Sequence, residues 1–181
     1  MRAFIALPLP DTVKKEIEKI QSELKVLPLD AKWVGPRLLH LTFKFLGDIG
    51  EEQIPGITQT IEETGKKFPR FEVALGEFGF FPNSRNPRVF FVATDHDEQL
   101  RAIAFWLEDE LEKIGFPKER KFKSHITLAR FRSVKNIVQL QMNIPAIPPQ
   151  LTFPADRLVL YKSTLTPHGP IYEEISSVNL K

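Results

Sequence analysis

Apolar residues recur at helical spacing in several stretches of the chain, and each stretch predicts an amphipathic helix. The first covers residues 11–25, with Asp11 as its expected N-cap. The second covers residues 51–67. The third, residues 97–114, has the clearest apolar stripe, and residues 134–140 are expected to form a short fourth helix.

Alternating or short apolar runs between these stretches predict strands. The strand candidates are residues 2–7, 39–46, 71–75, 78–81, 88–93, 124–131, 157–163 and 172–178. The alternation in residues 39–46 is strict, and it places His40, Thr42 and Lys44 on one face of the strand. Mixed strands and helices with few repeating βαβ units favour an α+β fold in a single domain, residues 1–181.

Composition narrows the class of protein. The chain has 181 residues, of which 42% are hydrophobic and 27% charged, as is typical of a globular protein. No apolar run reaches the roughly 18 residues that a membrane helix needs. The absence of cysteine excludes disulfides, thiolate metal sites and a cysteine nucleophile, and it makes a cytoplasmic location the default expectation. The net charge of +2 is too small for a bulk polyanion binder, although a few local positive groups can hold a nucleic-acid end.

A short internal repeat is the most informative feature of the sequence. Residues 39–43, LHLTF, recur in the second half as residues 124–128, SHITL. On a strand, a histidine and a threonine two positions apart point to the same face, while the apolar residues beside them anchor the other face. On a helix the two polar side chains would diverge. Each half of the chain therefore carries one strand with the same polar pair.

Two histidines can divide general acid and general base duties, because the unperturbed pKa of histidine lies near neutrality. In hydrolysis of a cyclic phosphodiester, one neutral imidazole takes a proton from water, and the other, as imidazolium, protonates the departing ribose oxygen. The hydroxyls of Thr42 and Thr127 can donate to nonbridging phosphate oxygens. Zinc binding is the alternative role for paired histidines, but no H-x-x-x-H, cysteine or suitably spaced carboxylate accompanies them. His96 and His168 lie in turn segments and are expected at the surface, His168 near the border of a cleft.

The two copies resemble the paired HxTx signature of the two-histidine (2H) phosphoesterase superfamily. The surroundings are similar to its RNA 2′,3′-cyclic phosphodiesterase branch, also called 2′-5′ RNA ligase. The residues that carry this likeness are 4–7 (FIAL), 33–34 (WV), 39–47 (LHLTFKFLG), 124–130 (SHITLAR), 160–163 (LYKS) and 165–172 (LTPHGPIY). The resemblance spans nearly the whole chain.

The resemblance implies a bilobal α+β fold with two antiparallel sheets, flanking helices and a central cleft between pseudo-twofold HxTx strands. It also implies hydrolysis of a terminal 2′,3′-cyclic phosphate on RNA to a 2′-phosphomonoester, with ATP-independent, reversible 2′-5′ ligation as a side activity. By the same resemblance His40 is the proton donor and His125 the proton acceptor. The residues alone leave this direction open, since the two copies are nearly symmetric.

Four further residues are candidate substrate ligands. Arg130 can bind phosphate or the RNA backbone, but strict alternation from His125 places it on the opposite face unless a bulge or strand end intervenes; a solvent-facing arginine is the alternative. Lys44 adds positive potential on the face of His40, or is a surface lysine. Trp33 and Tyr161 can stack on a base, as can two phenylalanines, whereas packing in the core is the competing role. The phenylalanines are Phe4 and Phe45.

No cofactor and no metal are expected. The expected partners are RNA ends with a 2′,3′-cyclic phosphate, tRNA fragments among them; no membrane is expected, and the protein is expected to be a monomer. Two other functions stay open. One is a cyclic phosphodiesterase for small nucleotides, and the other is a non-catalytic protein that binds RNA ends.

Overall fold

The computed structural model describes residues 1–95, 97–119, 121–148 and 151–181. The strands are β1 (Arg2–Pro8), β2 (Ala31–Trp33), β3 (His40–Asp48), β4 (Phe71–Phe81), β5 (Val89–Asp95), β6 (His125–Phe131), β7 (Thr152–Ala155), β8 (Arg157–Thr166) and β9 (Gly169–Asn179). Within the described residues they form one nine-stranded sheet in the order β7-β4-β5-β6-β3-β1-β8-β9, and β2 pairs with β6. Every strand pair is antiparallel.

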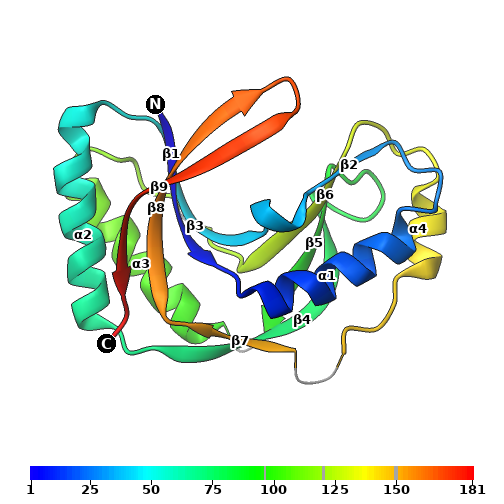
Figure 1. The fold of residues 1–181 in the computed structure, drawn as a ribbon, viewed down its shortest axis with the longest axis horizontal. Coiled ribbons are helices and arrows are strands. Elements are labelled where there is room, and N and C mark those ends of the chain that lie inside the picture. Colours follow the sequence, from blue (N-terminus) through cyan, green and yellow to red (C-terminus); the bar gives the residue numbers. More distant parts are fainter. Residues whose placement is uncertain (96, 120, 149–150) are drawn as a thin grey trace.

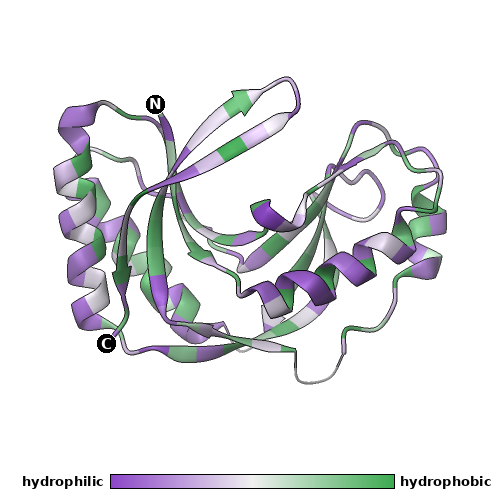
Figure 2. Ribbon diagram, in the orientation of Figure 1, coloured by the Kyte–Doolittle hydropathy of each residue, from purple (hydrophilic) through white to green (hydrophobic). Residues whose placement is uncertain are grey.

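The α-helices are α1 (Asp11–Leu24), α2 (Ile54–Lys67), α3 (Glu98–Lys113) and α4 (Ile137–Asn143), and two short 3₁₀ turns are η1 (Pro36–Leu38) and η2 (Glu51–Gln53). Figure 1 shows α2 and α3 beside one end of the curled sheet and α1 and α4 beside the other. Hydrophilic and hydrophobic residues follow each other along these helices in Figure 2, and the buried apolar side chains of the helices belong to the hydrophobic core. Of the helices in the described ranges, none has the length and apolar character needed to cross a membrane.

The sheet has an internal symmetry that follows the sequence repeat. From the centre outward, each half has an HxT strand (β3 or β6), then the strand that precedes a long helix (β1 or β5), and then two more strands. The halves meet at one residue pair, Leu41 opposite Ile126. The α+β fold class with a pseudo-twofold pair of HxTx strands is confirmed. The two expected antiparallel sheets are joined at this central pair.

Each long helix that follows an inner strand lies against the opposite half. α3 follows β5 but packs on β3, and α1 follows β1 but donates hydrogen bonds from Gln21 to backbone beside and within β6. The two halves are therefore interlocked by their helices as well as by the sheet.

Several boundaries differ from the sequence expectations. Pro10, in extended conformation, is the N-cap of α1, and Asp11 is its first helical residue, where its charge still suits the positive end of the helix dipole. The strand candidates 71–75 and 78–81 are one strand, β4, with a register shift between Leu75 and Phe78. The strands β2 and β7 were not expected, because three or four residues carry too little alternation to stand out.

A β-bulge at the same place in β3 and β6 breaks the strict alternation that the sequence suggested. In β3, Phe43 is the extra residue opposite β1, and in β6, Leu128 is the extra residue opposite β5. Both strands then show the same order of buried and accessible side chains over their first seven residues. A bulge exchanges the two faces of a strand, so residues beyond it point opposite to the simple prediction.

Candidate active site

A pocket of about 610 Å³ lies over the junction of β3 and β6. His40 and Thr42 reach it from β3, and His125 and Thr127 reach it from β6. The neighbours of these residues, Leu41, Ile126, Phe43 and Leu128, are buried on the other face of the sheet. The alternation in the two short motifs therefore places four polar side chains in one pocket, as the sequence predicts.

The register between the two strands sets how the motifs face each other. Leu41 lies opposite Ile126 in an antiparallel pair. Continued by one residue in each direction, this register places His40 beside Thr127 and Thr42 beside His125. Each histidine thus lies next to the threonine of the other copy, and the local twofold axis passes between them.

The two imidazoles are held in the same way. Nδ1 of His40 lies 2.7 Å from the carbonyl oxygen of Leu38, and Nδ1 of His125 lies 2.7 Å from that of Lys123. A carbonyl oxygen only accepts, so each Nδ1 carries the hydrogen and donates. Nε2 of each neutral ring is left as the nitrogen that exchanges a proton with a ligand.

Both histidines favour the neutral form in the free protein. The pKa of His40 is lowered to about 4, mainly by burial and to a smaller extent by the positive charges of His125 and Arg130, while the Nδ1 hydrogen bond acts in the opposite direction. Burial also lowers the pKa of His125, as do the charges of Lys123 and Arg130. An anion bound between the rings reverses part of this effect, because a negative charge favours imidazolium.

The charged side chains on the pocket wall are all basic. Arg2, Lys32 and Arg130 contribute to the lining, and no aspartate or glutamate occurs among the lining residues that the structure describes. Lys32 and Arg130 lie opposite each other where β2 pairs with β6. The wall therefore attracts an anion, and the two threonine hydroxyls add neutral donors.

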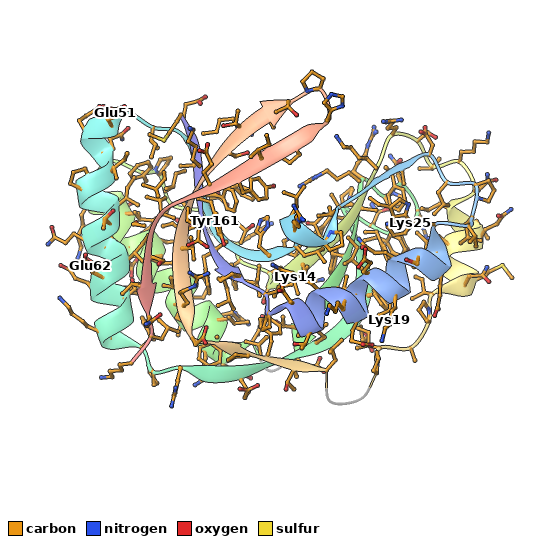
Figure 3. The ribbon with its side chains drawn as sticks, in the orientation of Figure 1. Lys14, Lys19, Lys25, Glu51, Glu62 and Tyr161 are labelled. Carbon is orange, nitrogen blue, oxygen red and sulfur yellow. The ribbon has the colours of Figure 1, made fainter. Side chains whose placement is uncertain are left out.

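Aromatic rings surround each histidine. The ring of Phe4 lies 4.9 Å from that of His40, and Tyr172 approaches the same imidazole edge-on at 5.4 Å. Phe81 approaches His125 edge-on at 4.9 Å. Each imidazole is therefore packed against aromatic rings, and burial lowers the pKa of both histidines. Tyr161 stacks on Phe4, with ring centroids 5.3 Å apart, and is not among the residues that line the pocket. Figure 3 labels Tyr161.

The structure brings most of the candidate residues together. Besides the four motif residues, Trp33 and Arg130 line the pocket. The bulge at Leu128 turns Arg130 to the face of His125. Strict alternation would have placed Arg130 on the opposite face. Phe45, at the corresponding position of β3, also lines the pocket and is 58% exposed.

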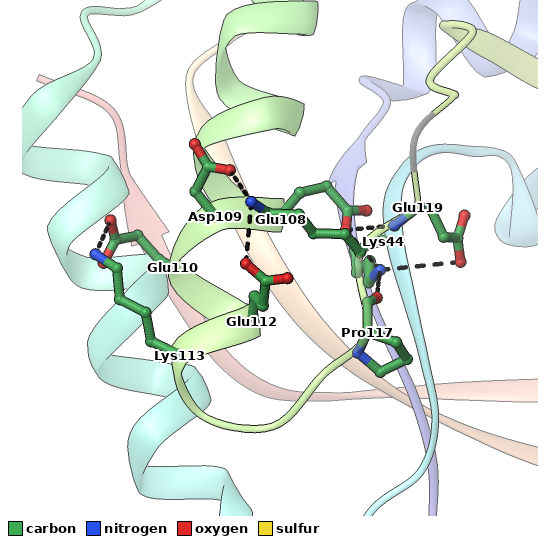
Figure 4. A network of polar contacts seen from close by, with 9 residues as sticks. Lys44, Glu108, Asp109, Glu110, Glu112, Lys113, Pro117 and Glu119 are labelled. Carbon is green, nitrogen blue, oxygen red and sulfur yellow. Dashed lines mark hydrogen bonds and ion pairs between the residues drawn. The ribbon is translucent and has the colours of Figure 1, made fainter.

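The expectation for Lys44 is wrong. The bulge at Phe43 turns Lys44 away from the face of His40, and only 4% of the residue is exposed. Its Nζ donates to the Glu108 carboxylate at 2.7 Å and to the carbonyl of Pro117 at 2.7 Å (Figure 4). Lys44 therefore joins β3 to α3 and to the loop that follows α3.

His168 is not among the residues that line the pocket. His168 lies exposed in the turn between β8 and β9, and His96 lies outside the described residues. No cluster of three or more potential metal ligands occurs within the described ranges.

Four basic or aromatic residues of the pocket lining were not singled out from the sequence. They are Arg2, Lys32, Phe81 and Tyr172. Lys32 and Tyr172 stand beside or within segments that carried the family resemblance, which was the available signal. Arg2 pairs with Ser163, far along the chain, and Phe81 pairs with Val89 of the next strand, and no local pattern reveals that either residue lines the pocket.

Paired HxT strands over a basic pocket define a phosphoesterase of the two-histidine class. A family profile described as "LigT like Phosphoesterase" matches the chain twice, at residues 7–91 and 92–172, so each match contains one HxT strand. The chain belongs to this LigT-like phosphoesterase family.

Curated relatives and solved structures agree with this membership. The chain is 34% identical over 173 residues to an RNA 2′,3′-cyclic phosphodiesterase of Thermotoga maritima, covering 96% of this chain and 92% of the relative. It is 34% identical over 177 residues to the enzyme of that name from Methanocaldococcus jannaschii, covering 97% and 98%. A Thermus thermophilus protein superimposes with a TM-score of 0.83 at 30% identity, covering 99% and 98%. E. coli LigT complexed with 3′-AMP shares the fold, with a TM-score of 0.81 at 23% identity, covering 99% and 96%.

Proposed function

We propose that this protein is an RNA 2′,3′-cyclic phosphodiesterase that converts a terminal 2′,3′-cyclic phosphate to a 2′-phosphomonoester. The observation that carries the proposal is the pair of histidines, each beside the threonine of the other copy, in one basic pocket. Relatives that cover nearly the whole chain bear this enzyme name, which supports the proposal.

The reaction needs an acid and a base on opposite sides of phosphorus. Water attacks phosphorus while Nε2 of neutral His125 takes its proton; the P–O3′ bond breaks, and Nε2–H of protonated His40 gives a proton to O3′. One P–O bond forms and one breaks. After the two proton transfers, His125 is protonated and His40 is neutral. Two imidazoles related by a local twofold axis suit such an in-line displacement, because the phosphate can lie on the axis between them.

The threonines and Arg130 have roles that follow from their donors. The hydroxyls of Thr42 and Thr127 donate to the nonbridging oxygens and hold the phosphate in line. The guanidinium of Arg130, next to Lys32, binds the phosphate or the preceding backbone of the strand. Trp33 offers an aromatic surface beside them.

The direction of proton transfer, from His40 to O3′ and from water to His125, comes from the family resemblance. Burial keeps His40 neutral in the free protein, so its role as acid requires the phosphate to raise its pKa on binding. The anionic diester supplies that charge directly between the two rings. Ligation of RNA ends would be the same displacement, with a ribose 5′-hydroxyl in place of water as the nucleophile.

A short RNA ending in a 2′,3′-cyclic phosphate tests the proposal, with the product identified as a 2′-phosphate or a 3′-phosphate. We expect a 2′-phosphate, formed equally well in the presence of EDTA. A cyclic mononucleotide is tested in parallel, and preferential turnover of it would favour the small-nucleotide alternative. RNA that binds without being cleaved would instead support a non-catalytic end-binding protein. Activity on tRNA fragments, the monomeric state and a cytoplasmic location stay predictions.

A further inference from the structure

Two buried polar side chains occupy equivalent positions on equivalent helices, and neither of them lines the pocket. Gln21 is the eleventh residue of α1, and Glu108 is the eleventh residue of α3. Gln21 is fully buried, and Glu108 is 7% exposed. Both contact the HxT strand of the opposite half, close to its bulge.

Gln21 contacts the bulge of β6 directly. Its Nε2 donates to the carbonyl oxygen of Leu128 at 3.0 Å and to that of Val34 at 2.8 Å. Leu128 is the extra residue of the bulge and is fully buried. The carbonyl oxygen of Leu128 also accepts the backbone N–H of Val34 at 2.9 Å, so Gln21 supplies a second donor to it from outside the strand ladder.

The equivalent contact in the other half supports this interpretation. Glu108 binds Lys44, the residue directly after the bulge residue Phe43, and its carboxylate also accepts the backbone N–H of Glu119. In both halves, a polar group from the crossing helix thus fixes the strand where its faces exchange. The residue next presented to the pocket is Arg130 in β6 and Phe45 in β3.

We propose that Gln21 is a positioning residue, which holds the bulge at Leu128 in the conformation that turns Arg130 into the pocket. The amide is not needed to fill space, since methionine or leucine has nearly its size. Oε1 of Gln21 has no hydrogen-bond partner in the described part of the chain, so burying this amide costs free energy that an apolar side chain would avoid. What the amide adds is a donor for two carbonyls, one of them at the bulge.

A double-mutant cycle tests this role, and its activity readout rests on the proposed function. Gln21→Met, Arg130→Met and the double variant are compared by kcat/KM on an RNA with a 2′,3′-cyclic phosphate end. We expect each single variant to lose on the order of tenfold to a hundredfold, as for a contact to a charged group. The double variant should lose little more than Arg130→Met alone, because both changes remove the same contact. Gln59→Met, on the exposed face of α2, is the matched control.

A purely structural Gln21 would give a different pattern. Wild-type kcat/KM in Gln21→Met, or a double variant whose loss equals the product of the single losses, would overturn the proposal. Melting temperatures establish that each variant is folded, and Gln21→Leu replaces Gln21→Met in the cycle if the latter does not fold.

The titration of His125, followed by NMR, gives a readout that needs no substrate. Arg130 and Lys123 both lower the pKa of His125, and the Gln21 variant leaves Lys123 in place. We expect the pKa of His125 to rise in Gln21→Met as it does in Arg130→Met, whereas an unchanged value would contradict the proposal. If the wild-type protein does not turn over RNA, the proposed function fails, and this titration still decides the role of Gln21.

Discussion

The two halves of the pocket are built alike up to the bulge and differ immediately after it. Each has a histidine whose Nδ1 donates to the carbonyl two residues earlier, followed by a threonine in the pocket. Two residues past the bulge, β6 presents Arg130, whereas β3 presents the apolar ring of Phe45. The histidine and threonine, which the two halves share, suit a symmetric group such as the phosphate. Arg130 and Phe45, which differ between the halves, suit an asymmetric substrate with charged backbone on one side and a base on the other.

The two histidines also differ in their surroundings. Phe4 and Tyr172 enclose His40, and burial lowers its pKa to about 4. His125 has exposed Lys123 two residues before it and Phe81 beside it. The same backbone therefore gives the two rings the same orientation, while their neighbours set how readily each one is protonated.

The largest effects are expected from the histidines, and the chemistry of the leaving group separates their roles. His40→Ala and His125→Ala should each reduce kcat/KM on the cyclic-phosphate RNA by about 10²–10⁴-fold. If His40 is the acid, a cyclic substrate with sulfur in place of O3′ should recover much of the loss in His40→Ala, because a thiolate departs without a proton. His125→Ala should stay slow on both substrates.

The control for this experiment is His168→Ala, which changes a histidine exposed in the β8–β9 turn and should retain wild-type turnover. Rescue of His125→Ala in place of His40→Ala would reverse the assigned direction of proton transfer. Full activity in either single variant would contradict the acid–base pair itself.

Substitution of the two threonines tests whether the phosphate lies on the local twofold axis. Thr42→Val and Thr127→Val should each lower kcat by about 10²–10³-fold, as when one donor to a developing charge is removed. Similar losses at the two positions would agree with a symmetric phosphate site. Kinetics on the RNA substrate and melting temperatures measure the two effects, and a lower melting temperature with unchanged kcat would make the hydroxyls structural.

Substitution of Arg130 and of Phe45 tests the part of the pocket in which the two halves differ. Arg130→Met should weaken kcat/KM on the order of tenfold to a hundredfold and reduce the slope of log kcat/KM against log salt concentration by about 1, since one phosphate contact is lost. Phe45→Leu should weaken RNA turnover by severalfold and leave the salt dependence unchanged, because stacking carries no charge. Equal salt slopes in the two variants would argue against a phosphate contact by Arg130.

The effect on stability is separate from the effects on activity, and it compares the burial of the two imidazoles. The pKa of His40 is lowered from 6.5 to about 4, so between these values the unfolded chain binds the additional proton. The free energy of unfolding should therefore fall as the pH drops from about 7 to 4, by up to ~3 kcal/mol at roughly 1.4 kcal/mol per pKa unit. Urea unfolding at the two ends of this range should show a weaker pH dependence in His40→Asn than in the wild type.

The matched control for the stability measurement is His168→Asn. His125→Asn should also weaken the pH dependence, since burial lowers the pKa of His125 as well. Equal pH dependence in His40→Asn and the wild type would show that other groups account for the acid sensitivity.

Local patterns predicted the elements that matter most for the site. Helical spacing located α1, α2 and α3, and alternation located β3 and β6 with their histidines and threonines on one face. Alternation failed from Lys44 onward, because the bulge at Phe43 exchanges the faces of the strand. The prediction that Lys44 shares the face of His40 was therefore wrong. For Arg130, the same alternation indicated that a bulge or strand end is needed to bring it to the face of His125.

The sequence by itself determined that two HxT strands exist, which residues they present and that histidine and threonine share a face, because a strand has a fixed period of two. Only the tertiary structure decided that Leu41 lies opposite Ile126, that Lys44 binds Glu108 and that Gln21 contacts the bulge before Arg130. These contacts join residues that are far apart in the chain. They depend on which buried polar groups find partners when the halves pack, and that information is absent from any local window of the sequence.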